Sequence, residues 1–443
     1  MKTLLAPDDA RQIVLEHCAP LAPTFQPHGE VLGLTLAQNI VAGTDLPPFD
    51  NSSMDGFALI SGDTAGASVS TPKTLRTLGT IAAGSPIEHT IEYSIAAGTC
   101  AKIMTGAPIP PGADAVVMRE ETRENDAQVE ILQSAQIGQN IRRRGSDVRV
   151  GETVIPKGTK IRAAQWAMLA SLGMSRVEVF PRPRVGIVTT GNEIVGVGDE
   201  LKSGQIRDSN SWALRALAAE CGAVVVSHQK IGDDAEVLQQ TLLAMFQTCD
   251  IVVTSGGVSA GDFDYVRDVV PQIADAHFWK VAMKPGKPVL FATRNENSRR
   301  IPVFGLPGNP VSVMVAWEQF VRPALLRMQG RTSWKRLELH VRVLDGFRSS
   351  AGRTEFARAL VAPGEVAPGE VAPGEVAPSE VAPSEVAPSE VAQGENGWTA
   401  RVSNEQGSGR LSTMTNANAL LVVPAETVGV RVGDILTAQM LEM

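Results

Sequence analysis

The stretch from Asp250 to Tyr265 limits the possible folds more than any other part of this chain of 443 residues. It begins with an uninterrupted apolar run, is interrupted at Gly256-Gly257, and resumes with helical spacing from Asp262 onward. The order strand, glycine loop, helix is typical of an open parallel α/β sheet, where such loops lie at the carboxyl ends of strands and bind ligands. Bare backbone N–H groups beside a helix N-terminus suit an anion, and Asp262 and Asp264 add carboxylates. The stretch therefore predicts a site for phosphate plus metal.

Strands and helices alternate around this stretch, from residue 181 to residue 330. The hydrophobic pattern predicts strands at 184–188, 224–226 and 302–305, and helices at 208–221, 233–248 and 311–328. Elements of these lengths predict a three-layer α/β domain with a mostly parallel sheet. Its three glycine-bearing loops, at 189–193, 256–257 and 306–310, should then share one edge of the sheet.

The remaining sequence is β-rich on both sides of this domain. An N-terminal helix is predicted at 6–20, a rigid proline-containing loop at 45–57, and a hairpin-like piece at 151–158. Residues 163–172 have the small and apolar side chains of a buried helix, whereas the type of 31–42 stays open. Strands return at 337–343 and 419–423. We therefore divide the chain into a linker region (1–50 and 141–180), a β-rich module (51–140), the α/β domain (181–330) and a C-terminal β region (331–443).

Residues 361–395 are seven pentads of the type Val-Ala-Pro-Gly-Glu or Val-Ala-Pro-Ser-Glu, the last being Val-Ala-Gln-Gly-Glu. Regular prolines forbid a helix and the side chains are too small for a core, so we predict an extended, mobile, acidic insertion. Repeat expansion in a tolerant surface loop explains the tract more simply than partner binding does. The tract also holds seven of the 48 acids and no base, which leaves 41 acids against 40 bases elsewhere.

Composition excludes several classes of protein. A nearly neutral body has no basic face for nucleic acid, no apolar run is long enough to span a membrane, and the N-terminus lacks the pattern of a signal peptide, so we expect a cytoplasmic protein. The four cysteines are scattered, which indicates buried thiols rather than disulfides or a zinc ribbon. The P-loop, dinucleotide-binding, zinc-protease and hydrolase motifs do not occur.

What remains is a set of carboxylates in loops, next to glycines or at the predicted ends of helices and strands: Asp55, Asp147, Glu193, Asp233 and Asp264. Taken singly, each is more often a turn former or a helix cap than a catalytic group. Lys280 and Lys284, near a Pro-Gly turn, suit either a solvated turn or an oxyanion.

Six segments in combination are more specific than any of them alone. They are Pro47–Phe57 (PPFDNSSMDGF), Ile103–Pro108 (IMTGAP), Thr189–Glu193 (TTGNE), Thr254–Ser259 (TSGGVS) with Asp264-Tyr265, Lys284–Pro288 (KPGKP) and Leu306–Ser312 (LPGNPVS). In this order the chain resembles the molybdopterin molybdenumtransferase family, which includes MoeA proteins and the E domain of gephyrin. The resemblance spans nearly the whole chain, and only the pentad tract has no counterpart.

The resemblance implies an elongated homodimer of four-part subunits, with an α/β molybdopterin-binding domain, a β-rich N-terminal module and a C-terminal β-barrel. It implies that the enzyme inserts molybdate into adenylylated molybdopterin with loss of AMP, in a Mg²⁺-dependent step. The active cleft would lie between the α/β domain of one subunit and the Ser-Met-Asp-Gly module of the other. A molybdopterin adenylyltransferase would act upstream as a partner.

The family's functional positions match residues of this chain motif by motif. The resemblance implies catalytic roles for Asp55, Thr105, Asp147, Glu193, Asp233 and Asp264, with Glu193, Asp233 and Asp264 as metal ligands. It implies substrate-binding roles for Ser255, Gly256, Gly257, Ser259, Lys280, Lys284, Pro307 and Pro310. Asn192 stands where many members have an acid, and Asp262 where many have Glu. Molybdate is a dianion, so Lys280, Lys284 and the N–H groups of the glycine loops are the candidates for positioning it.

Three alternatives to this function stay open. The protein could be a scaffold of gephyrin-like architecture, which the full set of acidic loop residues argues against. It could share only the α/β module with other nucleotide-processing proteins, which the segments Ser52–Gly56 and Ile103–Gly106 argue against. Tungstate could replace molybdate, since the two oxyanions have nearly the same size and charge.

Overall fold

The computed structural model describes the chain except for residues 126, 260, 262–263, 365–396, 404 and 442–443. Two compact units are present, unit 1 (residues 1–24, 33–37 and 178–443) and unit 2 (residues 25–32 and 38–177). The prediction for Asp262 and nearly all of the pentad tract fall outside the described residues.

Unit 1 contains a seven-stranded sheet with neighbouring strands in the order β1, β20, β22, β23, β19, β15 and β18. Their bounds are β1 (Lys2–Leu5), β20 (Asp275–Val281), β22 (Leu290–Glu296), β23 (Arg299–Leu306), β19 (Ile251–Ser255), β15 (Arg184–Thr190) and β18 (Val224–Ile231). Strands β23, β19, β15 and β18 are parallel, whereas β22 is antiparallel to both of its neighbours. The predicted mostly parallel sheet is confirmed.

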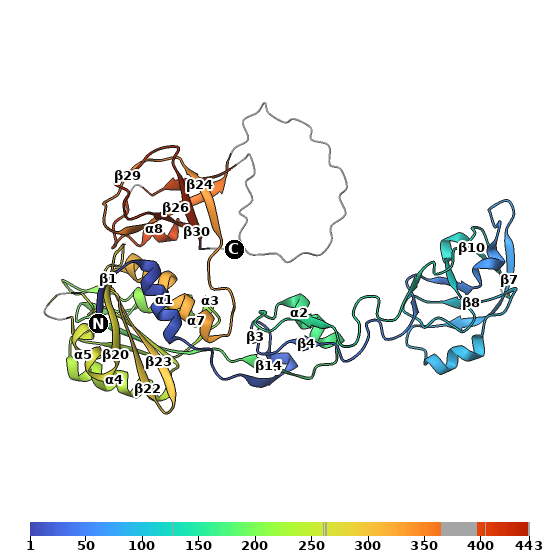
Figure 1. Cartoon of the computed structure of the whole chain (residues 1–443), viewed down its shortest axis with the longest axis horizontal. Helices are drawn as coiled ribbons and strands as arrows, with labels where there is room; N and C mark the ends of the chain where they lie inside the picture. The colour runs from blue at the N-terminus through green and yellow to red at the C-terminus, as the bar shows by residue number, and fades with distance from the viewer. Residues whose placement is uncertain (126, 260, 262–263, 365–396, 404, 442–443) are drawn as a thin grey trace. The chain divides into compact units, whose positions relative to one another are not determined.

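Helices cover both faces of this sheet (Figure 1). One face packs against α1 (Pro7–His17), α3 (Asn210–Glu220), α6 (Pro310–Ala316) and α7 (Arg322–Met328), and the other against α4 (Ala235–Thr248) and α5 (Tyr265–Ile273). Two apolar cores result, with Ile187 and Val253 facing one and Val188 and Val252 the other, as expected for strands buried on both faces. The three-layer prediction is therefore confirmed.

Several predicted elements of unit 1 differ in detail. The single helix predicted at 311–328 contains a π-helical turn, Trp317–Val321, between α6 and α7. Pro323 has no N–H to donate, which accounts for the irregular hydrogen bonding before it. β1 and α1 pack on the α/β sheet, although the sequence assigned residues 1–50 to the linker region.

A closed five-stranded β-barrel follows the α/β part of unit 1 (Figure 1). Its strands, in order around the ring, are β26 (Thr354–Pro363), β27 (Trp398–Val402), β24 (Glu338–Val343), β30 (Ile435–Met440) and β28 (Ala419–Val423), and β28 pairs again with β26. β21 (Met283–Lys284) joins β26 from outside, and α8 (Ser412–Thr415) and the pair β25 (Phe347–Arg348) and β29 (Gly429–Val430) lie nearby in sequence. β26 includes residues 361–363, so the first residues of the pentad tract are a strand.

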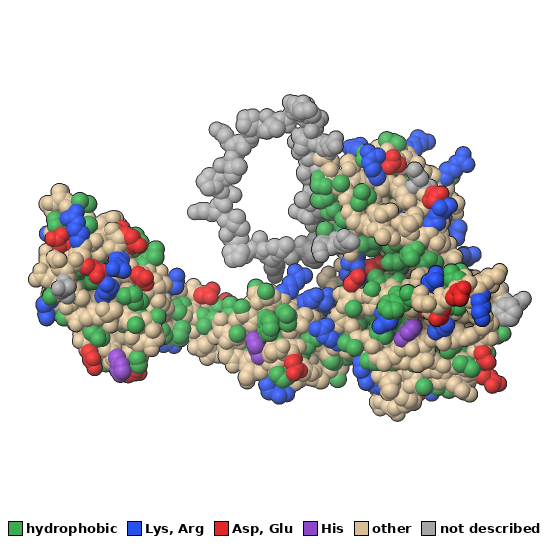
Figure 2. Space-filling model, turned by 180° about the vertical axis from the view of Figure 1, so that it is seen from behind, with side chains coloured by type: hydrophobic (Ala, Val, Ile, Leu, Met, Phe, Trp, Pro, Cys, Tyr) green, Lys and Arg blue, Asp and Glu red, His purple; other side chains and the backbone are tan. Residues whose placement is uncertain are grey.

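Unit 2 contains a six-stranded sheet in the order β10, β11, β7, β8, β6 and β9. The bounds are β10 (Thr122–Asn125), β11 (Gln128–Ile131), β7 (Lys73–Ile81), β8 (Thr99–Ile103), β6 (Gly56–Leu59) and β9 (Ala115–Met118). Gly56 is required here, because a Cβ atom at this position would lie 1.9 Å from the backbone oxygen of Val117. Lys, Arg, Asp and Glu side chains are mixed over this unit on the face that Figure 2 shows, as expected for a body without a basic face.

The rest of unit 2 is made of short strands, 3₁₀ turns and one helix. The strands are β4 (Ile40–Val41), β5 (Asn51–Ser52), β12 (Ile141–Arg142) and β13 (Thr153–Ile155), the helix is α2 (Ala163–Ser171), and β2 (Thr24–Pro27), β3 (Thr35–Leu36) and β14 (Arg176–Phe180) lie at the unit boundaries. The hairpin predicted at 151–158 is wrong, since β13 pairs with β4. The burial predicted for α2 is also wrong, because only Leu169 of this helix is buried. Within the described part of the chain, no helix is long and apolar enough to cross a membrane.

Candidate functional site

A cavity of about 860 Å³ lies at the carboxyl ends of β15, β19 and β23. The loops after these strands supply Thr190 and Gly191, then Gly256 and Gly257, then Pro307 to Pro310. The three glycine-bearing loops therefore share one edge of the sheet, as predicted. This edge is where open α/β sheets bind their ligands.

Gly256 and Gly257 let the central loop pass close to its neighbours. Both have positive φ, +95° and +64°, and a Cβ atom on Gly256 would lie 2.7 Å from Thr190 Oγ1 and 2.8 Å from the Thr190 backbone oxygen. Gly256 N donates to Leu306 O (3.1 Å), and Ser255 Oγ donates to Pro307 O (3.2 Å). Both hydrogen bonds tie the loop to the end of β23, and glycine is needed for its close approach to Thr190 at the end of β15.

Three predicted acids line this cavity: Glu193, Asp233 and Asp264. Asp233 Oδ2 accepts from the backbone N–H of Asn192 (3.3 Å), and Asn192 Oδ1 accepts in return from the Asp233 N–H (3.2 Å). Asp264 Oδ2 accepts from the Gly261 N–H (2.5 Å). Asn192 therefore joins the β15 loop to the segment before α4.

The donor set suits Mg²⁺, because hard cations prefer oxygen ligands. Within the residues that the structure describes, no three His, Cys, Asp or Glu side chains come together closely enough to hold a metal ion. Mg²⁺ in phosphate-handling sites is commonly bound by one or two carboxylates plus substrate phosphates, so a ready-made cage of protein ligands is not required. The cavity therefore fits a metal that arrives with a phosphorylated substrate.

The other predicted substrate-binding residues divide into two groups. Ser255, Gly256, Gly257, Ser259, Pro307 and Pro310 line the cavity, whereas Lys280 and Lys284 are not among its lining residues. Lys280 Nζ lies 3.7 Å from the centre of the Trp279 ring, and Lys284 Nζ pairs with Glu355 Oε1 (2.9 Å), a barrel side chain that is 2% exposed. Because a buried carboxylate engages Lys284, this lysine joins the α/β part of unit 1 to the barrel.

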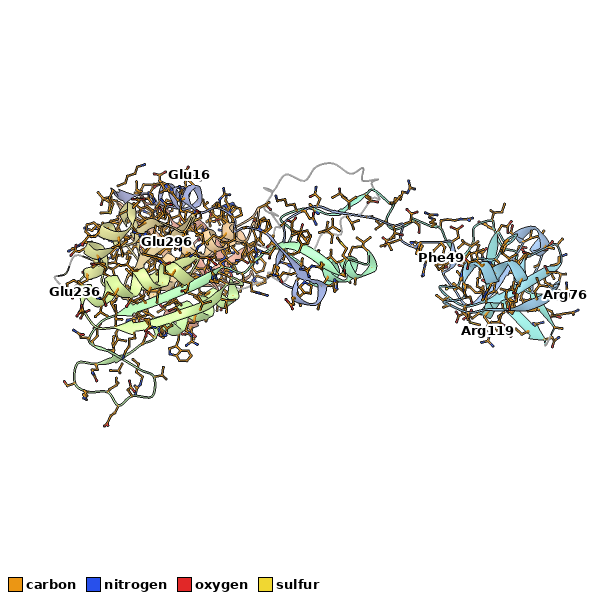
Figure 3. All side chains as sticks on the ribbon, turned by 90° about the horizontal axis from the view of Figure 1, so that it is seen from below. Glu16, Phe49, Arg76, Arg119, Glu236 and Glu296 are labelled. Carbon is orange, nitrogen blue, oxygen red and sulfur yellow. The ribbon has the colours of Figure 1, made fainter. Side chains whose placement is uncertain are left out.

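Asp55, Thr105 and Asp147 belong to unit 2, where all three are exposed. Asp55 Oδ1 accepts from both the backbone N–H (2.7 Å) and the hydroxyl (2.8 Å) of Thr105. These two hydrogen bonds hold the pKa of Asp55 below its usual value, and the bond from the backbone N–H has the larger effect. The positive charge of Arg119, labelled in Figure 3, lowers the pKa further by a smaller amount. Two segments 50 residues apart thus form one polar pair.

The sequence interpretation did not assign a site role to several other residues that line the cavity: Thr190, Arg207, Asp208, Asn210, Gly308 and Asn309. Arg207 is held by the carbonyl oxygens of Val197 (3.0 Å) and Asp199 (3.2 Å). It is a basic side chain on the lining that complements the acids. The sequence carries a signal in the polar residues Asp208 to Asn210, which the sequence interpretation assigned only to the start of the helix at 208–221.

The fold and the cavity define a class: an open-sheet α/β protein whose strand ends build an acid-lined, glycine-rich site suited to an anionic ligand. Family models agree along the chain. "MoeA N-terminal region (domain I and II)" matches residues 5–173, "Probable molybdopterin binding domain" residues 186–327, and "MoeA C-terminal region (domain IV)" residues 384–441.

Relatives with assigned names cover most of the chain. A molybdopterin molybdenumtransferase of Haemophilus influenzae is 34% identical over 358 residues, which cover 80% of this chain and 85% of the relative. One of Staphylococcus epidermidis is 33% identical over 412 residues, covering 92% and 88%. Among solved structures, a molybdopterin biosynthesis MoeA protein of Pyrococcus horikoshii matches with a TM-score of 0.76 at 28% identity, over 99% of this chain and 100% of that one. The chain belongs to the molybdopterin molybdenumtransferase family, and it is a transferase of molybdenum cofactor biosynthesis.

Proposed function

We propose that the enzyme transfers molybdenum from molybdate to adenylylated molybdopterin, with release of AMP, in a step that requires Mg²⁺. Water cleaves the phosphoanhydride bond, so that AMP leaves and the water oxygen ends on the phosphates. The two dithiolene sulfurs bind the molybdenum in place of one oxo group of molybdate, which leaves as water with the two thiol protons. The observation that supports this best is the cavity of unit 1, which combines an anion-suited glycine loop with the carboxylates Glu193, Asp233 and Asp264.

Each part of the cavity has a role in this proposal. The Gly256 N–H is bound to Leu306 O, so the Gly257 N–H and the guanidinium of Arg207 would hold phosphate oxygens, since both supply donors without a negative charge. Glu193, Asp233 and Asp264 would hold Mg²⁺, which when bound neutralises charge on the phosphates. Orientation and electrostatics thus account for the catalysis, without a covalent enzyme intermediate.

The direct test uses the purified full chain with adenylyl-molybdopterin, Mg²⁺ and molybdate, and measures AMP release and cofactor formation. Asp264→Asn should lower the rate by roughly 100-fold or more, the range seen when one electrostatic group of an active site is removed. The variant must unfold at the wild-type temperature for the result to count. A folded Asp264→Asn enzyme with full activity would remove Asp264 from the mechanism. The same assay with tungstate compares the two oxyanions.

We also propose a homodimer in which a second subunit supplies Asp55, Thr105 and Asp147. In support, these residues do not line the cavity of unit 1, and the family resemblance implies a shared cleft. Asp55→Ala and Asp264→Ala homodimers should both be inactive. Mixed and refolded together they should regain about a quarter of wild-type activity, since half of the dimers are mixed and each has one complete site. No recovery in dimers proven to be mixed would place Asp55 and Asp264 in one subunit's site.

The supply of substrate is the last part of the proposal. An adenylylated pterin is consumed here, so an upstream molybdopterin adenylyltransferase is the expected partner, in the cytoplasm. Titration calorimetry of the two purified proteins, with and without bound adenylyl-molybdopterin, tests for a complex. Cell fractionation tests the compartment.

A further inference from the structure

Asn210, the first residue of α3, has one half of its side-chain amide engaged and the other half free. Its Nδ2 donates to the backbone oxygen of Gly308 (2.6 Å) and to Ser255 Oγ (2.9 Å). A carbonyl oxygen only accepts, so the NH₂ group must face Gly308, and this fixes the position of Oδ1. Asn210 is 8% exposed, and its Oδ1 is buried without a hydrogen bond from any residue in the described ranges.

A buried acceptor without a donor is unfavourable and rare, which calls for an explanation at this position. Asn210 lines the cavity together with Ser255 and Gly308, its two acceptors. The buried side-chain atoms without a partner on His28, Thr35 and Glu121, within the described residues, do not belong to residues lining this cavity. Asn210, which carries the unpaired oxygen, is therefore a lining residue of the site.

The neighbours of Asn210 hold its amide in one orientation. Ser255 Oγ donates its proton to Pro307 O (3.2 Å), which leaves its lone pairs to accept from Asn210 Nδ2. The amide is thus fixed by the loops after both β19 and β23. An acceptor fixed before the ligand arrives loses little conformational freedom on binding.

We propose that Asn210 Oδ1 accepts a hydrogen bond from an N–H group of the pterin ring, so that Asn210 positions the pterin in the cavity. This inference rests on the proposed function. Phosphate and molybdate present acceptor oxygens and would be repelled by Oδ1, whereas a pterin carries an amide N–H and an amino group on one edge. AMP also has donors, but Asn210, Ser255 and Gly308 all lie in the segment matched by the molybdopterin-binding family model.

The test compares two fluorescent probes, a pterin with a phosphorylated side chain and the same pterin with methylated amide and amino nitrogens. Dissociation constants are measured for wild type, Asn210→Leu, Asn210→Ala and Ser255→Ala by fluorescence anisotropy. The ratio of the two constants is the decisive quantity, because general damage to the loop changes both. Leu keeps the approximate shape of Asn, which separates hydrogen bonding from steric exclusion, and Ala provides a second variant if Leu disturbs folding.

For wild type, the dissociation constant of the methylated pterin should be about tenfold or more above that of the unmethylated pterin, which is the difference in affinity that one buried hydrogen bond gives. Ser255→Ala, which retains Oδ1, should keep a preference, whereas both Asn210 variants should bind the two probes within about twofold. An equal preference in wild type and the Asn210 variants overturns the proposal. The proposal is also overturned if an Asn210 variant binds AMP more weakly than wild type does but binds the unmethylated pterin equally well.

The wild-type AMP-release assay separates this inference from the proposed function. Donor-dependent pterin binding without AMP release would refute the proposed reaction and leave the role of Asn210 standing. AMP release by a wild-type enzyme that binds both pterin probes equally well would support the proposed reaction and refute the role of Asn210.

Discussion

Gly256 is a lining residue of the cavity at which the structure requires glycine. It has φ of +95°, and a Cβ atom there would lie 2.7 Å from Thr190 Oγ1 and 2.8 Å from the Thr190 backbone oxygen. A left-handed backbone costs a residue with a side chain about 1–2 kcal/mol. The close contact adds about 1–3 kcal/mol, because the backbone oxygen cannot rotate away. Gly256→Ala should therefore destabilise unit 1 by about 2–5 kcal/mol.

Gly308 is the matched control for this change. It lines the same cavity, but its φ is not positive, and among the described residues the only atom within 4 Å of an added Cβ is the Cα of Gly256, at 3.8 Å. Gly308→Ala should change stability by less than about 0.5 kcal/mol. The two variants add the same methyl group to neighbouring loops, so their difference isolates the backbone conformation and the contact with Thr190.

Urea unfolding followed by tryptophan fluorescence measures the effect in the right unit. Five of the six tryptophans lie in unit 1 and only Trp166 lies in unit 2, so the signal reports mainly on unit 1. Gly256→Ala should unfold at clearly lower urea than wild type, with an unchanged slope. A Gly256→Ala midpoint equal to that of wild type would refute the argument, and so would equal losses in Gly256→Ala and Gly308→Ala.

Three further predictions concern ionisable groups. Burial alone would raise the pKa of Asp250, but hydrogen bonds from Arg184 keep it below its usual value; its contribution to stability is thus present at neutral pH and lost as the pH falls below about 4. Asp250→Asn should cost about 2 kcal/mol at pH 7, less than the roughly 3–5 kcal/mol for breaking a fully buried pair because Arg184 is 47% exposed, and should reduce the acid sensitivity seen in urea unfolding; unchanged stability at pH 7 would contradict this. Thr105→Val removes one of two hydrogen bonds to Asp55, so the pKa of Asp55 should rise toward its ordinary value in an NMR titration, and an unchanged pKa would show that the backbone N–H suffices. Burial raises the pKa of Cys18 to about 12, so this thiol should react with a thiol reagent only in urea, and rapid labelling of Cys18 in the native protein would contradict its burial.

The α/β fold could be predicted because its signals are local. Apolar runs, glycine breaks and helix caps each occupy a few consecutive residues. The pair Asp233-Asp234 marked the start of α4, where Asp234 is the residue that caps the helix through the Val237 N–H. Long-range pairing left no such signal. β1 has four residues that are mostly exposed, so no alternation marks it as an edge strand beside β20, and the partner of β13 lies more than 100 residues away.

The site was predictable to the extent that strand ends determine it. Glu193, Asp233 and Asp264 line one cavity because their loops follow neighbouring strands or precede the helices packed beside them. Lysines are different, since a long flexible side chain takes the partner that the tertiary structure offers. Lys284 pairs with Glu355, whose position depends on how the barrel meets β21. A Lys-Pro-Gly segment gives no information about that contact.

Asn210 shows how a residue of the binding site that lies at a helix start can be recognised in a sequence. A helix start needs one side-chain cap, and the carboxylate of Asp208 already accepts from the Ser211 N–H (2.9 Å) while its other oxygen accepts from Thr189 Oγ1 (3.0 Å). The amide of Asn210, two residues further on, bonds outside the first turn of α3. It does so through Gly308 and Ser255, at the edge of the sheet where ligands bind. A residue of a capping type that is not needed for the cap, and that lies at the edge of the sheet where ligands bind, is therefore a candidate for the binding site. This holds even when the residues next to it in the sequence have structural roles.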